Sequence, residues 1–197
     1  MGSAQGTGSV PVVVSSWGLV EDALRWLQAH YTDQRFYVER DIVWTLQRWL
    51  GTEARRCGLP VSIYNDYPTE PGPRRALSAD LALVAEGPVP EVVMELKYEP
   101  SHRRTDITTG KFPVVGGWSA VVSDASRVTT WVADGRARSG AAVFIDEGGW
   151  LAAKTSDSGQ WDHWGGYGTD DLDVHIHRIA LPPAVDIEFG PSTGVIA

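Results

Sequence analysis

The sequence predicts an α/β protein with a central mixed sheet flanked by helices, and the order of its periodic segments carries this prediction. Residues 17–49 repeat apolar side chains at three- and four-residue steps, the period of an amphipathic helix. Short apolar segments with tight connections follow as expected strands: 61–66, 79–85 and 91–99. A second helical pattern at 118–138 and an apolar run at 141–145 complete the order αβββαβ. Helices packed on a sheet bury the apolar faces of both, so this order favours a layered fold.

The first helical stretch is long enough for two helices, or for one helix broken near residues 30–32. We expect Asp33 to cap the second helix and Gly51 to end it. The three strands that follow are close in sequence, which predicts an antiparallel meander. The run at 141–145 does not alternate with polar residues, which is typical of a strand buried on both faces.

The core is expected at about 36–146, followed by an extension of strands and loops at 147–197. Within the extension, residues 156–173 are rich in glycine and aromatic side chains and are interpreted as a long surface loop. Residues 173–180 alternate and predict an edge strand, and a further short strand is expected at 185–189.

Length and composition fit one globular domain. The chain has 197 residues, 43% of them hydrophobic and 21% charged. Residues 1–16 are interpreted as a flexible leader without the features of a signal peptide, and 17–197 as a single domain. No apolar run reaches the roughly 18–20 residues that span a bilayer, and the one cysteine, Cys57, excludes an internal disulfide framework. We therefore expect a cytoplasmic protein with no membrane partner.

The net charge of −8 is unevenly distributed. Residues 35–111 contain eleven basic and eleven acidic side chains, whereas residues 112–197 contain five basic and eleven acidic ones. The acidic excess therefore lies mostly in the C-terminal part. Global charge alone does not exclude a nucleic-acid partner.

The residues that carry chemistry centre on the strand at 91–99. Glu95 and Lys97 are two residues apart in a strand, so they share one face of the sheet. Asp80 lies on the preceding strand and can bring a second carboxylate to the same point. Two carboxylates, the backbone carbonyl of Leu96 and water suit Mg²⁺ or Mn²⁺ rather than zinc.

In this order of elements, Asp80 followed by Glu95-Leu96-Lys97 resembles the PD-(D/E)xK nuclease superfamily, whose fold is that of many restriction endonucleases. The residue before Asp80 is Ala79, where the family usually has proline. The resemblance implies a restriction-endonuclease-like core and a Mg²⁺- or Mn²⁺-dependent endonuclease acting on DNA. Many members carry a helical glutamate, for which Glu39 is the candidate in this chain. Small nucleases of this fold often act as homodimers.

In this interpretation the carboxylates of Asp80 and Glu95 bind the metal, and Glu39 holds a metal-bound water or a second ion. Lys97 orients the attacking water and stabilises charge on the phosphate; whether it is also the base is left open. Basic residues near the strand are candidate phosphate contacts. These are His102, Arg103, Arg104 and Lys111 after the strand, and Arg74 and Arg75 in the preceding loop.

Simpler interpretations stay open for each of these residues. Glu95 and Lys97 could be an exposed pair on an edge strand, Asp80 a turn cap and Glu39 a solvated helix residue. The arginines could serve only solubility. The whole chain could be a nuclease-like fold without activity that binds nucleic acid or assembles with proteins.

Two further clusters lie in the C-terminal part. Asp173, His175 and His177 alternate on one strand face and could bind zinc, or could be half-exposed side chains without a ligand. His163 could form an aromatic platform for bases with its neighbours Trp161, Trp164 and Tyr167, or the segment could simply pack on the sheet.

Overall fold

The computed structural model describes residues 15–70, 78–104, 117–155, 159–167 and 172–184. The described elements are α1 (Ser16–Ala29), the short 3-10 helix η1 (Tyr31–Asp33), α2 (Glu39–Cys57), β1 (Ser62–Pro68), β2 (Ser78–Val84), β3 (Val92–Glu99), α3 (Trp118–Ala133), β4 (Gly140–Asp146), β5 (Gln160–Tyr167) and β6 (Leu172–Leu181). The predicted α/β class and the predicted order αβββαβ are confirmed. In the described part of the chain, no helix is both long and apolar enough to cross a membrane.

The strands form one six-stranded mixed sheet in the order β1-β2-β3-β4-β6-β5. Strands β1, β2 and β3 pair antiparallel, as the predicted meander requires. Strands β3 and β4 pair parallel, with α3 as the crossover between them, and β6 and β5 add antiparallel pairs. Strand β3, which carries Glu95 and Lys97, is therefore central. Of its residues Val92 to Glu99, Lys97 is half-buried and the others are buried.

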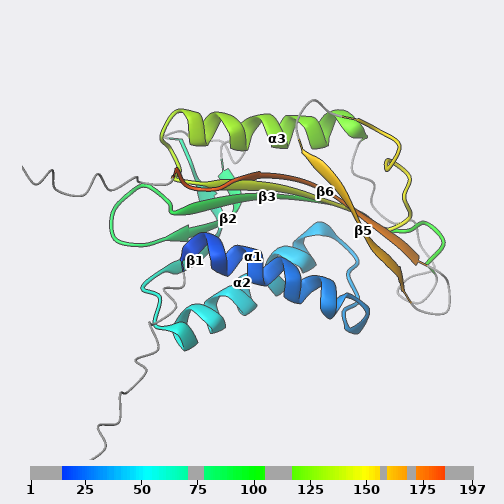
Figure 1. Ribbon diagram of the computed structural model, residues 1–197, viewed down its shortest axis with the longest axis horizontal. Coiled ribbons are helices and arrows are strands. Elements are labelled where there is room, and N and C mark those ends of the chain that lie inside the picture. Colours follow the sequence, from blue (N-terminus) through cyan, green and yellow to red (C-terminus); the bar gives the residue numbers. More distant parts are fainter. Residues whose placement is uncertain (1–14, 71–77, 105–116, 156–158, 168–171, 185–197) are drawn as a thin grey trace, which may run out of the picture.

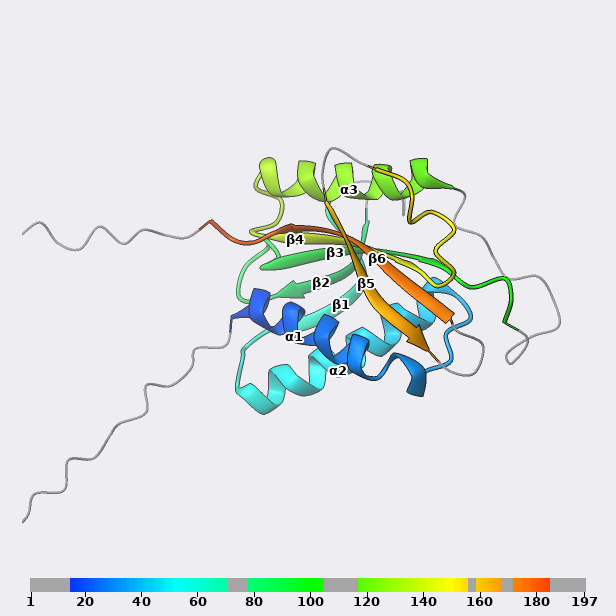
Figure 2. The same ribbon diagram turned by 45° about the vertical axis from the view of Figure 1, so that its right-hand side comes forward.

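The helices cover both faces of the sheet: α3 lies on one face, and α1 and α2 lie on the other (Figures 1 and 2). Strand alternation sends the side chains of β3 to the two layers in turn. Met94, Leu96 and Tyr98 join the core with α1 and α2, and Val93 joins the core with α3. Glu95 and Lys97 lie two and four residues after Val93 in the same strand, so their side chains point to the same face, toward α3.

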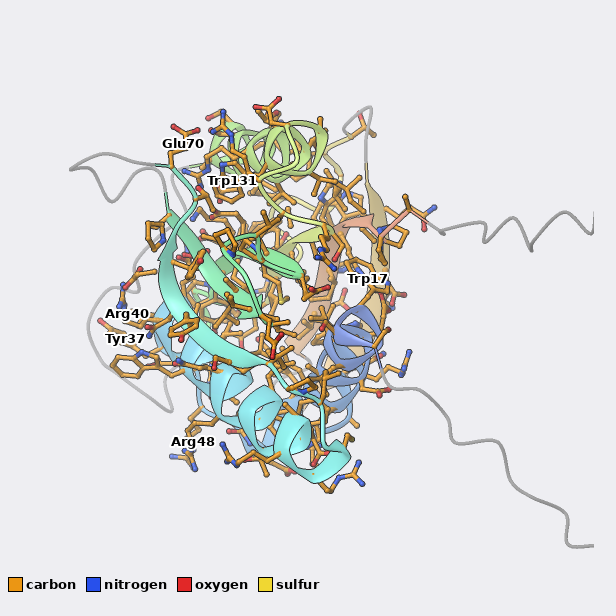
Figure 3. The ribbon with its side chains drawn as sticks, turned by 90° about the vertical axis from the view of Figure 1, so that its left-hand side faces the viewer. Trp17, Tyr37, Arg40, Arg48, Glu70 and Trp131 are labelled. Atoms are coloured by element: carbon orange, nitrogen blue, oxygen red, sulfur yellow. The ribbon has the colours of Figure 1, made fainter. Side chains whose placement is uncertain are left out.

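The helices are amphipathic, as their periodicity predicted. Arg48 is exposed on the outer side of α2, and Arg40 is exposed beside β1, where it pairs with Asp66, whereas Trp131 of α3 is only 2% exposed (Figure 3). Ser15 caps α1 through its Oγ, which accepts a hydrogen bond from the Gly18 amide at 3.0 Å. Helix α1 then buries one apolar stripe against the sheet: Leu19, Val20, Ala23, Leu24 and Leu27.

The predicted ends of the second helix are wrong. Helix α2 begins at Glu39, six residues after Asp33, and its first turn is fixed by Asp41 Oδ2, which accepts from the Tyr37 and Val38 amides at 2.8 and 3.0 Å. The helix continues through Gly51 to Cys57 and is capped by Gly58, whose φ of 68° suits glycine. Packing of α2 on β1 outweighs the cost of about 1 kcal/mol for a mid-helix glycine.

The C-terminal part also differs from the prediction. The segment interpreted as a surface loop contains β5, and β5 is the edge strand, so β6 is an inner strand between β4 and β5. Glycines and a bulge between His163 and Gly165 hide the strand period of β5 in the sequence. The expected strand at 185–189, most of the leader at 1–16 and the basic residues Arg74, Arg75 and Lys111 lie outside the described residues.

Candidate functional site

The candidate site lies between β3 and α3, and its centre is Lys97. The ammonium Nζ of Lys97 is 3.3 Å from Glu39 Oε2 and 3.0 Å from Asp124 Oδ2. Its side chain is 22% exposed, so these are partly buried ion pairs rather than solvated ones. The site thus joins the first turn of α2, the end of β3 and the middle of α3.

Asp80 is held against β3 by a backbone hydrogen bond. Its Oδ2 accepts from the Leu96 amide at 2.7 Å. The described ladder between β2 and β3 runs from Leu83↔Val92 to Leu81↔Met94, so the carboxylate of Asp80 binds β3 where the backbone pairing ends. Asp80 does not cap a turn into its own strand; it lies next to the strand that carries Glu95 and Lys97.

Glu95 is the most buried acid of the site, with 2% exposure. Its Oε2 accepts from Arg127 of α3 at 3.0 Å, its carboxyl group interacts with that of Asp80, and its Oε1 has no hydrogen-bond partner of standard geometry among the described residues. Arg127 also pairs with Asp124, one helical turn earlier. A buried carboxylate oxygen without a partner is costly, and it is common where a ligand or ion completes the site.

Sequence reasoning missed Asp124 and Arg127. The apolar face of α3 is formed by Val121, Ala125 and Val128, and Asp124 lies on the same side, where it is 5% exposed. A charged residue at a position that the helical period assigns to the core was the available signal. Its partner in β3 could not be found without the crossover that lays α3 over that strand.

Acidic charge exceeds basic charge in this cluster. Four carboxylates lie close to two cations: those of Glu39, Asp80, Glu95 and Asp124, with Lys97 and Arg127. We call these six residues the acidic cluster. Paired buried charges are tolerated, but an uncompensated excess is unfavourable unless protons or a cation neutralise it. The residues present therefore fit a divalent cation in both charge and donor type.

Burial and the excess of negative charge shift the pKa values of the residues in this cluster. Burial, followed by the negative charge of Asp80, raises the pKa of Glu95 to about 9. Burial also raises the pKa of Asp80 and of Glu39. Burial alone would lower the pKa of Lys97, but Glu39 and Asp124 outweigh it and the net direction is upward. Lys97 is therefore protonated at neutral pH, and Glu95 holds a proton when no cation replaces it.

The carboxylates are not arranged as a closed metal cage. Within the described residues, the three side chains whose ligand atoms all lie within 4.8 Å of one another are His163, Asp173 and His175, outside this cluster. A small pocket lined by Glu95, Lys97 and other residues of β3, α3, β4 and β6 has room for about one water molecule. The predicted carbonyl ligand, Leu96 O, lies 3.4 Å from Lys97 Nζ.

The predicted phosphate contacts separate into exposed and buried residues. Arg103 is exposed, and His102 is exposed but bonded to Glu99 at 2.8 Å. Arg104 is buried, and its guanidinium donates to Glu147 Oε1 at 2.8 Å. We therefore correct the interpretation of Arg104: it fixes the segment after β3 to the end of β4 and does not face a phosphate.

The two C-terminal clusters are rearranged relative to the prediction. Trp161 stacks on Trp118 of α3, whereas Trp164 packs against Tyr31 on the opposite face, so they do not form one platform. The side chain of Tyr167 lies outside the described ones. His177 is buried against Trp118 and Trp161 and is not part of the group with Asp173, in which His163 takes its place.

Comparison with protein-family models, curated proteins and solved structures finds no match to this chain. The resemblance to PD-(D/E)xK nucleases accordingly rests on Asp80, Glu95, Lys97 and Glu39, and on the order of the elements that carry them.

Proposed function

We propose that this protein is a metal-dependent nuclease of the PD-(D/E)xK type, built on a restriction-endonuclease-like core, that hydrolyses phosphodiester bonds in DNA. One observation carries the proposal: four residues singled out from the sequence, on three different elements, meet around Lys97. The pair Glu95 and Lys97 is not an exposed edge pair, because β3 is central and Glu95 is 2% exposed. Glu39 is not merely solvated, because it pairs with Lys97.

Asp80 and Glu95 are the residues that would hold the metal, with Glu39 beside them. A Mg²⁺ or Mn²⁺ ion bound there would polarise the scissile phosphate and lower the pKa of the attacking water. Oxygen donors are what these hard cations prefer. The partnerless Oε1 of Glu95 and the acidic excess of the cluster support the assignment.

Lys97 supplies a fixed positive charge at this point. Because Glu39 and Asp124 hold it protonated, its role is to orient the attacking water by hydrogen bonding and to offset negative charge on the phosphate, rather than to accept a proton. Arg127 keeps the carboxylate of Glu95 in place through the 3.0 Å contact. It acts as a positioning residue rather than a catalytic one.

The substrate would approach from the end of β3. His102 and Arg103 follow this strand directly and are exposed there, as backbone-phosphate contacts need to be. Such contacts are independent of base sequence, so the proposal includes no sequence specificity.

Cleavage assays test the proposal directly. Plasmid and short duplex DNA are incubated with Mg²⁺, Mn²⁺ or EDTA, beside single-stranded DNA and RNA. We expect metal-dependent cleavage that Glu95→Gln and Lys97→Met each reduce by at least about 100-fold, because charge stabilisation in the transition state is lost. Glu91→Gln is the matched control, since Glu91 precedes the same strand and pairs with Arg138 outside the cluster. Full activity in Glu95→Gln, or in excess EDTA, contradicts the proposal.

A second candidate is a nuclease-like module that binds partners without catalysis. Its support is that Lys97 and Arg127 already neutralise part of the acidic cluster, together with the net charge of −8. Calorimetric titration with Mn²⁺ separates the two. Heat of binding that disappears in Glu95→Gln favours the nuclease, and no binding up to millimolar Mn²⁺ favours the module.

A further inference from the structure

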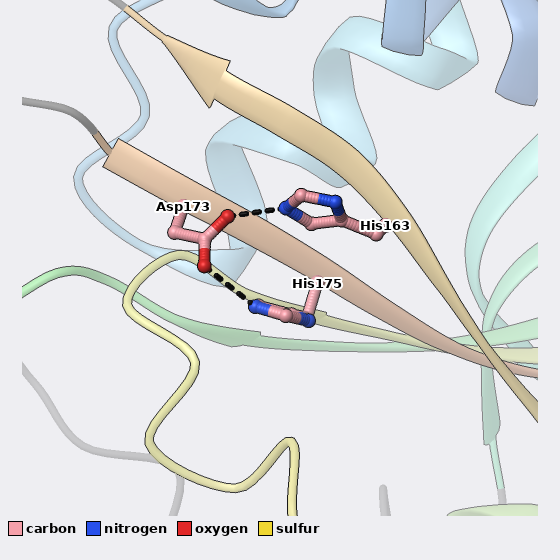
Figure 4. A group of neighbouring side chains, drawn as sticks. All are labelled: His163, Asp173 and His175. Atoms are coloured by element: carbon pink, nitrogen blue, oxygen red, sulfur yellow. Dashed lines mark hydrogen bonds and ion pairs between the residues drawn. The ribbon is translucent and has the colours of Figure 1, made fainter.

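A second group of metal-ligating side chains lies on the edge hairpin formed by β5 and β6, away from the acidic cluster. His163 comes from β5, and Asp173 and His175 come from β6 (Figure 4). His163 and His175 are direct cross-strand partners, and Asp173 is two residues from His175 and so on the same face. The pleat of two paired strands thus brings all three to one point.

The side chains are aimed at one another. His175 Nε2 is 3.0 Å from Asp173 Oδ2, and His163 Nε2 lies against the other oxygen, Asp173 Oδ1. The three ligand atoms all lie within 4.8 Å of one another. Zinc bonds of about 2.0–2.1 Å in tetrahedral geometry place ligand atoms about 3.3 Å apart, so small side-chain rotations suffice to close this group on an ion.

The surroundings keep His175 in this orientation. The ring of Trp161 meets that of His175 edge-on at 6.4 Å, and Gly149, in the turn after β4, also packs against the His175 ring. A Cβ at Gly149 would lie 3.2 Å from His175 Nε2, the ligand atom itself. Glycine with φ of 66° therefore leaves the space beside that nitrogen open.

We propose that His163, Asp173 and His175 bind a zinc ion that joins the edge strand β5 to β6. Two imidazoles and one carboxylate form a nitrogen-rich set that suits zinc better than Mg²⁺. The side chains of His163 and Asp173 are 56% and 53% exposed, so water completes the coordination. Strand β5 pairs on one side only, with β6, so a cross-strand metal stabilises an edge of the sheet.

This site is independent of the proposed nuclease centre. Its strand β6 is separated from β3 by β4, and none of its ligands belongs to the acidic cluster. The two proposals therefore fail separately: loss of the zinc site leaves the carboxylates intact, and loss of the carboxylates leaves the hairpin intact.

Zinc titration of the tag-free, chelator-treated protein tests the site. We expect one zinc ion per chain by calorimetry, and with Co²⁺ the visible absorption of a tetrahedral complex. His163→Ala and Asp173→Asn, both at exposed positions, should each weaken binding by at least about tenfold. Zinc should also raise the melting temperature of the wild-type protein but not of these variants.

Two controls make the result specific. His30→Ala removes an exposed histidine that follows α1 and lies outside the group, and Glu95→Gln alters the nuclease centre; both variants should bind zinc as the wild type does. Unchanged zinc affinity in His163→Ala and Asp173→Asn, or no binding to the wild type, overturns the proposal and leaves a His–Asp–His hydrogen-bonded group. Zinc binding lost in Glu95→Gln would place the ion in the acidic cluster and overturn it as well.

Discussion

At the scale of single residues, strand alternation was enough to find the centre of the candidate site. Glu95 and Lys97 share one face because they are two residues apart, and Asp80 was identified because it lies on the neighbouring strand. Asp124 could not be found in this way, since its partner Lys97 lies 27 residues earlier on another element. Arg104 was misassigned for the same reason: the sequence does not show that a buried glutamate 43 residues later will pair with it.

The raised pKa of Glu95 predicts how stability depends on pH. In the folded protein without metal the pKa is about 9, against an ordinary value of 4.5. Between these values the native state holds a proton that the unfolded state releases, so stability falls as pH rises through this range. Glu95→Gln removes the contribution of this residue and leaves the smaller one from Asp80 and Glu39, whose pKa values burial also raises. At pH 8 in EDTA the variant should be more stable than the wild type by roughly 1–3 kcal/mol.

Urea unfolding at several pH values between 5 and 9 measures this effect. Glu91→Gln serves as the control and should keep the wild-type slope. A Glu95→Gln variant whose stability falls with pH as steeply as the wild type would show that Glu95 is already ionised.

At the scale of elements, the long periodic segments were predictable and the irregular ones were not. Helix α3 has a clear apolar period and β4 an unbroken apolar run, and both formed where expected, although α3 ends at Ala133, five residues before the predicted end. Strand β5 was missed because its sequence, QWDHWGGY, has glycines and a bulge in place of alternation. Arg104, five residues after β3, was interpreted as a phosphate contact, yet it is buried and ties the start of this segment to the core through Glu147.

The contact between this segment and β4 is a buried network around Glu147, which is 1% exposed. Its carboxylate accepts from Arg104 at 2.8 Å, from the Ser101 amide at 2.9 Å and from the Tyr31 hydroxyl at 3.1 Å. Glu147→Ala leaves the guanidinium of Arg104 buried without this partner, so it should cost about 3–5 kcal/mol of unfolding free energy.

Denaturant unfolding measures this cost, with Asp22→Ala as the comparison. Asp22 pairs with Arg25 on α1, where the two side chains are 53% and 66% exposed, and its loss should change stability by less than about 0.5 kcal/mol. Equal effects of the two substitutions would mean that the Glu147 network contributes nothing to holding the end of β3.

At the scale of the whole molecule, the acidic cluster connects both helical layers through the central strand. Glu39 comes from the layer of α1 and α2, Asp124 from α3, and Lys97 from the strand between them. A ligand bound at such a junction stabilises the folded state as a whole, because its residues come together only when all three layers are assembled. A change in melting temperature on adding metal therefore detects metal binding without any cleavage assay.

This arrangement predicts a metal effect that depends on pH. Since Glu95 must lose its proton to bind a cation, Mg²⁺ or Mn²⁺ competes with that proton and binds more tightly as pH rises. The metal should accordingly raise the melting temperature by several degrees at pH 8.5 and by much less at pH 6. Thermal scans at both pH values, with and without metal, measure the difference, and Glu95→Gln should show none at either. Because zinc at the edge hairpin would be bound by His163, Asp173 and His175 instead, the Mg²⁺ effect should persist in His163→Ala. An equal Mg²⁺ effect at both pH values would separate metal binding from the protonation of Glu95 and count against this residue as a ligand.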